Sequence, residues 1–178
     1  MDIGTINGEG LKAIARRSLE DAFDGNDAGV TDEEMIEFGQ KYGVFVTLKV
    51  DGNLRGCIGR LDHEWPVWRK VPELARAAAF EDNRFEPLSL NEMNGLDIEV
   101  TLLDEPVEVN ELSEVVIGRD GLIVEKGFYK GLLLPQVATE YGWGVEEFLS
   151  HTCLKAGLDA DEWKRGKVRV YRFEGIIV

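Results

Sequence analysis

The chain has 178 residues, 44% of them hydrophobic and 30% charged, a composition typical of one soluble globular domain. Lysine and arginine number 20 and aspartate and glutamate 34, so the net charge is 20 − 34 = −14, which argues against direct nucleic-acid binding. The two cysteines form no disulfide framework, the N-terminal residues carry no apolar leader, and no run of about 18 apolar residues is present. We therefore expect a cytoplasmic protein with reduced thiols and no membrane span.

The first part of the chain is expected to form two helices and a β-hairpin. An apolar stripe predicts a helix over residues 8–23, and Thr31 opens the capping box of a second, short helix. The β-branched run 44–50 predicts a strand, and the turn residues 51–53 lead into a second strand. That second strand carries residues 54–59, which read LRGCIG and are called the LRGCIG motif below.

The rest of the chain is expected to alternate short strands and helices. A helix is expected over residues 66–81, with Pro72 as a kink or the first turn, and Ser89 and Glu92 are expected to cap a brief turn after it. Two further helices are expected, one that begins at Pro135 and one over residues 145–156. The expected strands span residues 96–103, 115–117, 122–124 and 168–173, the middle two forming a hairpin around Gly118–Gly121, with a further turn bracketed by Gly127 and Gly131. Strands joined by short turns favour an antiparallel sheet flanked by helices, an α+β fold.

The LRGCIG motif places a guanidinium, a thiol and two glycines on one strand. Because side chains alternate along a strand, Arg55 and Cys57 are expected on one face and Leu54 on the other. If Leu54 reaches the core, Arg55 and Cys57 stand together on the side away from the core. A guanidinium near a thiol favours the thiolate, so Cys57 is a candidate nucleophile and Arg55 a candidate partner for an anionic group. Gly56 and Gly59 would let a ligand or another backbone come close. The alternative is that Cys57 is a small buried residue and Arg55 an exposed strand cation.

A second polar cluster, residues 82–85, follows the expected helix 66–81. Arg84 in this cluster could bind an anion, or it could pair with Asp82 and fix the loop. A nucleophilic cysteine usually needs a base, and the two histidines, His63 and His151, are the candidates.

A zinc site made of Cys57, His63, His151 and Cys153 is a further hypothesis. The spacing of these four residues does not match zinc-finger or zinc-ribbon patterns. The chain also carries no phosphate loop and no dinucleotide fingerprint. We therefore expect neither a metal nor a cofactor.

The LRGCIG motif and a series of further blocks resemble the AMMECR domain family, in its archaeal branch. The matching blocks are, in chain order, residues 43–48, 84–85, 87–88, 96–100, 121–124, 131–138 and 142–143, so the resemblance covers essentially the whole chain. The resemblance implies one domain over residues 1–178 with two lobes. A larger lobe would use both chain ends around an antiparallel sheet, a smaller lobe would be inserted, and the motif would lie close to their junction.

The resemblance also bears on function, although the family has no settled biochemical activity. In prokaryotes its members often occur beside or fused to Memo-like proteins and radical SAM proteins, which implies a shared modification pathway. We predict a site for a small-molecule or protein substrate, with Cys57 as the catalytic residue and Arg55, Gly56, Gly59 and Arg84 as ligand-binding residues. The alternative is a non-catalytic docking or adaptor module for such enzymes.

Overall fold

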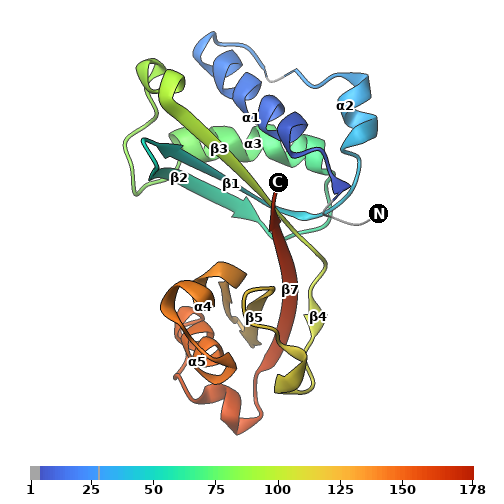
Figure 1. Cartoon of the computed structure of the whole chain (residues 1–178), viewed down its shortest axis with the longest axis vertical. Helices are drawn as coiled ribbons and strands as arrows, with labels where there is room; N and C mark the ends of the chain where they lie inside the picture. The colour runs from blue at the N-terminus through green and yellow to red at the C-terminus, as the bar shows by residue number, and fades with distance from the viewer. Residues whose placement is uncertain (1–4, 28) are drawn as a thin grey trace. The chain divides into compact units, whose positions relative to one another are not determined.

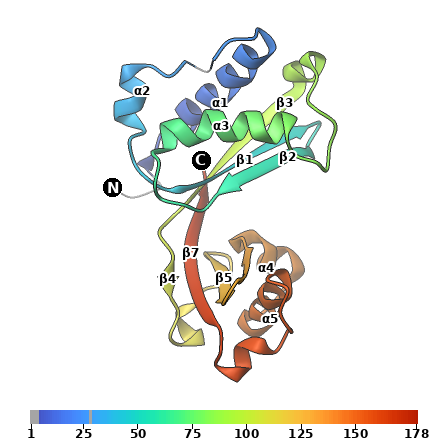
Figure 2. The same cartoon turned by 180° about the vertical axis from the view of Figure 1, so that it is seen from behind.

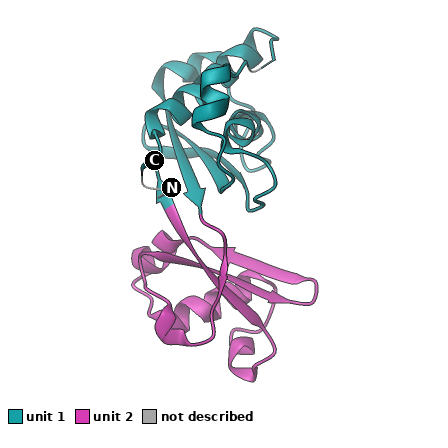
Figure 3. Cartoon of the chain, turned by 90° about the vertical axis from the view of Figure 1, so that its right-hand side faces the viewer, with its two compact units in different colours: residues 1–103, 176–178 teal, residues 104–175 magenta. Residues whose placement is uncertain are grey.

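The computed structural model describes residues 5–27 and 29–178, and its helices and antiparallel sheets confirm the α+β class. The chain divides into two compact units (Figure 3), residues 1–103 with 176–178 and residues 104–175. In the part of the chain that is described, no helix is both long and apolar enough to cross a membrane. The expectation about a leader concerns in part residues 1–4, which lie outside the described residues.

The first unit is a three-stranded antiparallel sheet with helices on one face (Figures 1 and 2). Its strands, in the order β2–β1–β3, are β1 (Gly43–Val50), β2 (Asn53–Arg60) and β3 (Leu96–Leu103). Its helices are α1 (Gly8–Phe23), α2 (Asp32–Glu37) and α3 (Val67–Phe80), followed by a 3-10 helix η2 (Leu90–Gly95). The chain returns to this unit at its C-terminus, where the Val178 N–H donates to the Val100 carbonyl at 3.0 Å.

Local signals set the helix boundaries of this unit as expected. The Asn7 side chain accepts the Gly10 N–H at 3.1 Å and caps α1, which spans the expected residues. At α2 the Thr31 hydroxyl accepts the Glu34 N–H and the Glu34 carboxylate accepts the Thr31 N–H, which confirms the capping box. Pro72 lies inside α3 and not in its first turn, because that helix already begins at Val67.

The β1–β2 hairpin contains a bulge that changes its register. The turn is tight, with Asp51 at φ 50° and Gly52 at φ 77°, two left-handed residues as a type I′ turn requires. Val50 pairs with Asn53 and Lys49 with Leu54, but Leu48 pairs with Gly56. Arg55 is therefore the extra residue of a β-bulge on β2.

The second unit is a four-stranded antiparallel sheet with two helices packed on β5 and β6 (Figure 1). Its strands, in the order β6–β5–β7–β4, are β4 (Val107–Glu108), β5 (Asp120–Lys126), β6 (Tyr129–Leu133) and β7 (Arg169–Ile177), whose end belongs to the first unit. Its helices are α4 (Pro135–Tyr141) and α5 (Val145–Lys155), with the short 3-10 helices η3 (Leu112–Glu114) and η4 (Glu162–Arg165). A separate apolar core, which includes Phe148 and Leu149, joins these layers.

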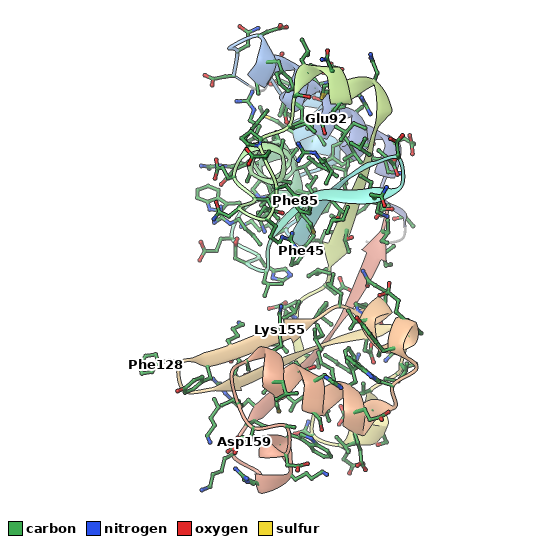
Figure 4. All side chains as sticks on the ribbon, turned by 90° about the vertical axis from the view of Figure 1, so that its left-hand side faces the viewer. Phe45, Phe85, Glu92, Phe128, Lys155 and Asp159 are labelled. Atoms are coloured by element: carbon green, nitrogen blue, oxygen red, sulfur yellow. The ribbon has the colours of Figure 1, made fainter. Side chains whose placement is uncertain are left out.

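The prediction of a hairpin around Gly118–Gly121 is wrong. Residues 115–117 are not a strand, because the buried Asp120 carboxylate accepts the Val116 N–H at 2.8 Å and the Asp120 N–H donates to the Val116 carbonyl, which closes a turn. The hairpin of this unit is β5–β6, with its turn at Gly127 and a fully exposed Phe128 at its tip (Figure 4). Gly131 lies inside β6 and not at a turn, where an added Cβ would stand 2.3 Å from the Ala156 nitrogen on α5's C-terminal side.

Candidate functional site

The bulge places Cys57 on the outer face of the first unit's sheet, by which we mean the face turned away from α1 and α3. Val46 and Leu48 are fully buried on the helix-covered face, so Thr47, between them, points to the outer face. Cys57 is the cross-strand partner of Thr47, and the Thr47 Oγ1 lies 3.2 Å from the Cys57 Sγ. The Cys57 residue is half-buried. The thiol therefore stands on a sheet surface and is not part of the helix-facing core.

Asp82, directly after α3, binds the free edge of β2 at Cys57. Its side chain is 5% exposed, and its carboxylate accepts the Cys57 N–H at 2.9 Å and the Arg84 N–H at 3.2 Å. The Arg84 guanidinium donates to the same carboxylate through Nε at 2.9 Å and Nη2 at 2.7 Å. These hydrogen bonds, led by those from the Arg84 side chain, hold the pKa of Asp82 far below its usual range. Asp82 is therefore a fixed anion that ties the loop to the strand.

Arg84 is the arginine that contacts the cysteine residue. Its Nη2 donates to the Cys57 carbonyl at 3.2 Å, while 57% of its side chain remains exposed. The guanidinium carbon lies 5.5 Å from the centre of the Phe85 ring. Hydrogen bonding to Asp82 raises the pKa of Arg84, and the Cys57 side chain adds a smaller electrostatic contribution in the same direction. The pairing with Asp82 that the sequence offered as an alternative is present, together with an exposed cationic surface beside Cys57.

Arg55 makes its contacts with the segment between α3 and β3. Its Nε and Nη2 donate to the two carboxylate oxygens of Glu92 at 2.7 and 3.2 Å, and Nη1 donates to the Glu86 carbonyl at 2.8 Å. Nη2 also lies 3.3 Å from the Pro87 carbonyl, and 16% of the side chain is exposed. The arginine expected beside the thiol is thus engaged by the protein's own acceptors, because the bulge at this residue breaks the simple alternation along β2. Leu54 does not meet the condition of that expectation, since it is 44% exposed and not in the core.

The two motif glycines make room for the protein's own atoms. A Cβ on Gly56 would stand 2.1 Å from the Ala78 carbonyl oxygen of α3, so Gly56 faces the helices and admits another backbone. A Cβ on Gly59 would stand 2.2 Å from a ring carbon of Phe45, its cross-strand partner. Figure 4 labels Phe45 on β1, and Phe85 and Glu92 on the segment that links α3 to β3. Of the two possibilities raised for these glycines, close approach of another part of the chain is the one that the structure contains.

The histidines and the second cysteine make other contacts. The His63 Nε2 lies 3.3 Å from the Leu103 carbonyl, and the His151 ring stacks on Trp143 with ring centres 3.8 Å apart. Cys153 is buried in the second unit, and burial raises the pKa of its thiol. Within residues 5–27 and 29–178, no group of three or more histidine, cysteine, aspartate or glutamate side chains is arranged to hold a metal ion.

Sequence reasoning missed two features of this site. Thr47 gave no signal, since its position opposite Cys57 depends on the bulge. Glu92 caps the short turn that begins at Ser89, as expected, because the Ser89 N–H and hydroxyl both donate to its carboxylate at 2.8 Å. Its second role, as the partner of Arg55, joins residues 37 positions apart and left no local pattern.

Comparison with known proteins places the chain among similar sequences over nearly its whole length. A family model described as AMMECR1 matches residues 12–178. Protein MJ0810 of Methanocaldococcus jannaschii is 49% identical over 79% of this chain and 74% of its own, and Protein NEQ441 of Nanoarchaeum equitans is 44% identical over 94% and 97%. The crystal structure of the uncharacterized protein PH0010 from Pyrococcus horikoshii has a TM-score of 0.87 and 40% identity, covering 97% of this chain and 92% of that one.

Proposed function

This chain belongs to the AMMECR1 family, and we propose that the β1–β2 hairpin of its first unit forms a site for a small anionic ligand or substrate. Arg84 binds the anionic group, and Cys57 acts as a nucleophile or transient covalent carrier. The observation that carries the proposal is the position of the half-exposed Arg84 guanidinium on the Cys57 peptide, held there by the buried Asp82.

The arrangement supports this assignment through charge and orientation. The positive Arg84 guanidinium attracts an anionic electrophile to the strand residue that carries the thiol. Asp82 uses its carboxylate to accept hydrogen bonds from Cys57 and Arg84, so it orients Arg84 and is a poor proton acceptor, since its pKa is strongly lowered by Arg84. Thr47 lies within hydrogen-bond distance of the sulfur and limits its rotation. Phe85, next to Arg84, offers an apolar surface to the rest of the ligand.

The covalent step uses no cofactor. The Cys57 thiol loses its proton to water, and a sulfur electron pair attacks an electrophilic carbon of the ligand. A sulfur–carbon bond forms as the bond from that carbon to the leaving group breaks, and the leaving group departs with the electrons of that bond. In this scheme Arg84 is a binding residue, Cys57 the catalytic residue, and Arg55, Gly56 and Gly59 belong to the scaffold that holds them.

The test compares an anionic with a neutral thiol reagent on the native protein. Iodoacetate and iodoacetamide alkylate the same sulfur, and peptide mass spectrometry separates Cys57 from the buried Cys153. A unit charge about 4 Å from Arg84 in water gains about 1 kcal/mol, which corresponds to about a fivefold faster reaction. We therefore expect Arg84→Gln to lower the iodoacetate-to-iodoacetamide rate ratio at Cys57 about fivefold, and Arg84→Lys to retain most of it.

Arg69→Gln is the matched control, because it removes the same charge from a residue whose guanidinium carbon lies over the Trp65 ring, 3.6 Å from its centre. The ratio in this variant should equal that of the wild type. High salt should reduce the wild-type ratio, since a screened charge attracts less. If Cys57 reacts only after unfolding, or if Arg84→Gln and Arg69→Gln give the same ratio, the proposal is wrong.

A second candidate function is a non-catalytic docking module. The observation that favours it is that Ala78 occupies the space beside Gly56 and Phe45 the space beside Gly59, as expected where the glycines of a motif allow close packing of the fold. A Cys57 thiol that stays inert in the native protein would favour this candidate. The partners would then be Memo-like or radical SAM proteins, which remains a prediction from the family resemblance.

A further inference from the structure

We infer that Arg55 is a positioning residue, which clamps the segment between α3 and β3 onto β2 and so holds Arg84 at Cys57. The inference rests on the proposed anion site and names the residue on which its geometry depends. It departs from the sequence-based expectation, in which Arg55 itself would bind the anion.

The first support is the way in which the Arg55 guanidinium is used. All three of its nitrogens donate to the segment. Nε and Nη2 donate to the Glu92 carboxylate, Nη1 donates to the Glu86 carbonyl, and Nη2 also donates to the Pro87 carbonyl. A planar fork that meets a carboxylate with two parallel hydrogen bonds fixes direction as well as charge. With 16% of the side chain exposed, the fork is directed at the protein and not at solvent.

The second support is the backbone at Arg55. Lys49 pairs with Leu54 and Leu48 with Gly56, so Arg55 is the inserted residue and has no cross-strand partner of its own on β1. Bulges of this kind redirect a side chain from the regular alternation of a strand. The bulge therefore does two things at once, since it turns Arg55 to the segment and places Cys57 opposite Thr47.

The third support is that the segment is attached to β2 at two points with Arg84 between them. At one end the Asp82 carboxylate accepts the Cys57 N–H. At the other end Glu92 binds Arg55, and hydrogen bonds from Arg55 and then from Ser89 lower the pKa of Glu92 to about 2. Between these ends, Arg55 also holds the carbonyl of Glu86, two residues beyond Arg84. Without Arg55, the segment would keep its attachment to β2 at Asp82 and its attachment to α3 at Leu88, whose N–H donates to the Ala79 carbonyl at 2.8 Å, but the part around Glu86 and Glu92 would no longer be tied to β2.

The experiment separates the geometry of Arg55 from its charge. Arg55→Lys keeps the positive charge but removes the fork, and Glu92→Gln keeps the size of the acceptor but removes its charge. We expect each to lower the iodoacetate-to-iodoacetamide ratio at Cys57 by about two- to fivefold, with little change in the iodoacetamide rate, because Arg84 is displaced while the sulfur stays accessible. The double variant should lose little more than either single variant, since both remove one interaction.

Glu34→Gln is the matched control, because Glu34 is also a capping-box carboxylate that accepts hydrogen bonds from an arginine, Arg17, and it lies on α2, outside the hairpin and the segment. It should leave the ratio unchanged. Hydrogen exchange of the peptides covering residues 83–92 is the second measurement, and it should speed up in Arg55→Lys and Glu92→Gln but not in Glu34→Gln.

The outcomes separate this inference from the proposed function. If the wild-type ratio depends on Arg84 but Arg55→Lys keeps the wild-type ratio and exchange, Arg55 is no positioning residue, and the anion site stands without it. If the wild-type ratio does not depend on Arg84, the anion site itself fails and takes this inference with it. If Arg55→Lys does not fold, Glu92→Gln, which leaves β2 unchanged, decides by the same ratio.

Discussion

Replacing Gly56 with alanine is the sharpest test of how the LRGCIG motif is packed. The new Cβ would stand 2.1 Å from the Ala78 carbonyl oxygen and 3.0 Å from the Ala78 carbonyl carbon. Ordinary contact begins at 3.4 Å, so the overlap with the oxygen is 3.4 − 2.1 = 1.3 Å. Both atoms belong to the backbone of α3 and cannot rotate away, so β2 and α3 must separate.

The expected cost follows from this overlap. Overpacking a core usually costs about 1–3 kcal/mol, and a backbone obstacle places Gly56→Ala at the upper end, about 3 kcal/mol. The alanine also restricts the unfolded chain, which returns about 0.4–1 kcal/mol and leaves a net loss of about 2 kcal/mol or more. For a chain of this size each kcal/mol lowers Tm by about 2–4 °C, so a fall of about 4–8 °C is expected.

Urea unfolding followed by far-UV circular dichroism, with thermal unfolding beside it, measures the effect. Gly95→Ala is the control, because nothing lies within 4 Å of its added Cβ and its φ is outside the left-handed region. Gly59→Ala should be intermediate, about 1–2 kcal/mol, since the Phe45 ring that it meets is a side chain and can shift. If Gly56→Ala is as stable as Gly95→Ala, the packing interpretation is refuted, and Gly56 must be explained by a ligand.

Two further predictions concern charged groups of the first unit. Hydrogen bonds from Arg55 and then from Ser89 lower the pKa of Glu92 from 4.5 to about 2, so the carboxylate's contribution to folding is complete above pH 4.5 and is lost as the pH falls through about 2. The stability difference between wild type and Glu92→Gln, measured by urea unfolding, should therefore shrink over that window, and a difference independent of pH would contradict these interactions of the carboxylate. Lys70 is fully buried and donates to the backbone carbonyls of Tyr42 and Asp62. Lys70→Ala should therefore lower the free energy of unfolding by about 2–4 kcal/mol, because it leaves a cavity and removes these hydrogen bonds. A change below about 0.5 kcal/mol would show that this buried ammonium does not support the fold.

The parts of the fold that the sequence predicted depend on neighbours only a few positions away. The bounds of α1, the capping boxes at Thr31 and Ser89, and strand β3 each follow from side chains within one or two turns or one period of alternation. The α+β class followed in turn from these elements and their short connections. Where a short-range signal was ambiguous, the prediction failed: residues 115–117 are as β-branched as a strand, but the buried Asp120 carboxylate draws them into a turn.

The candidate site was decided by tertiary structure. If the hairpin had no bulge, the pairing that starts at Val50 and Asn53 would set Val46 opposite Cys57, and the thiol would be buried on the helix-covered face. The inserted Arg55 shifts the register by one residue, so that the thiol lies on the outer face. Local sequence was enough to place an arginine, a thiol and two glycines on one strand. Which arginine contacts Cys57 depends on how the chain folds back, because Arg84 is 27 positions away and donates to the Cys57 carbonyl while the buried Asp82 holds its guanidinium. Alternation along a strand relates neighbours in sequence, whereas a bulge and a returning loop depend on the packing of the whole unit.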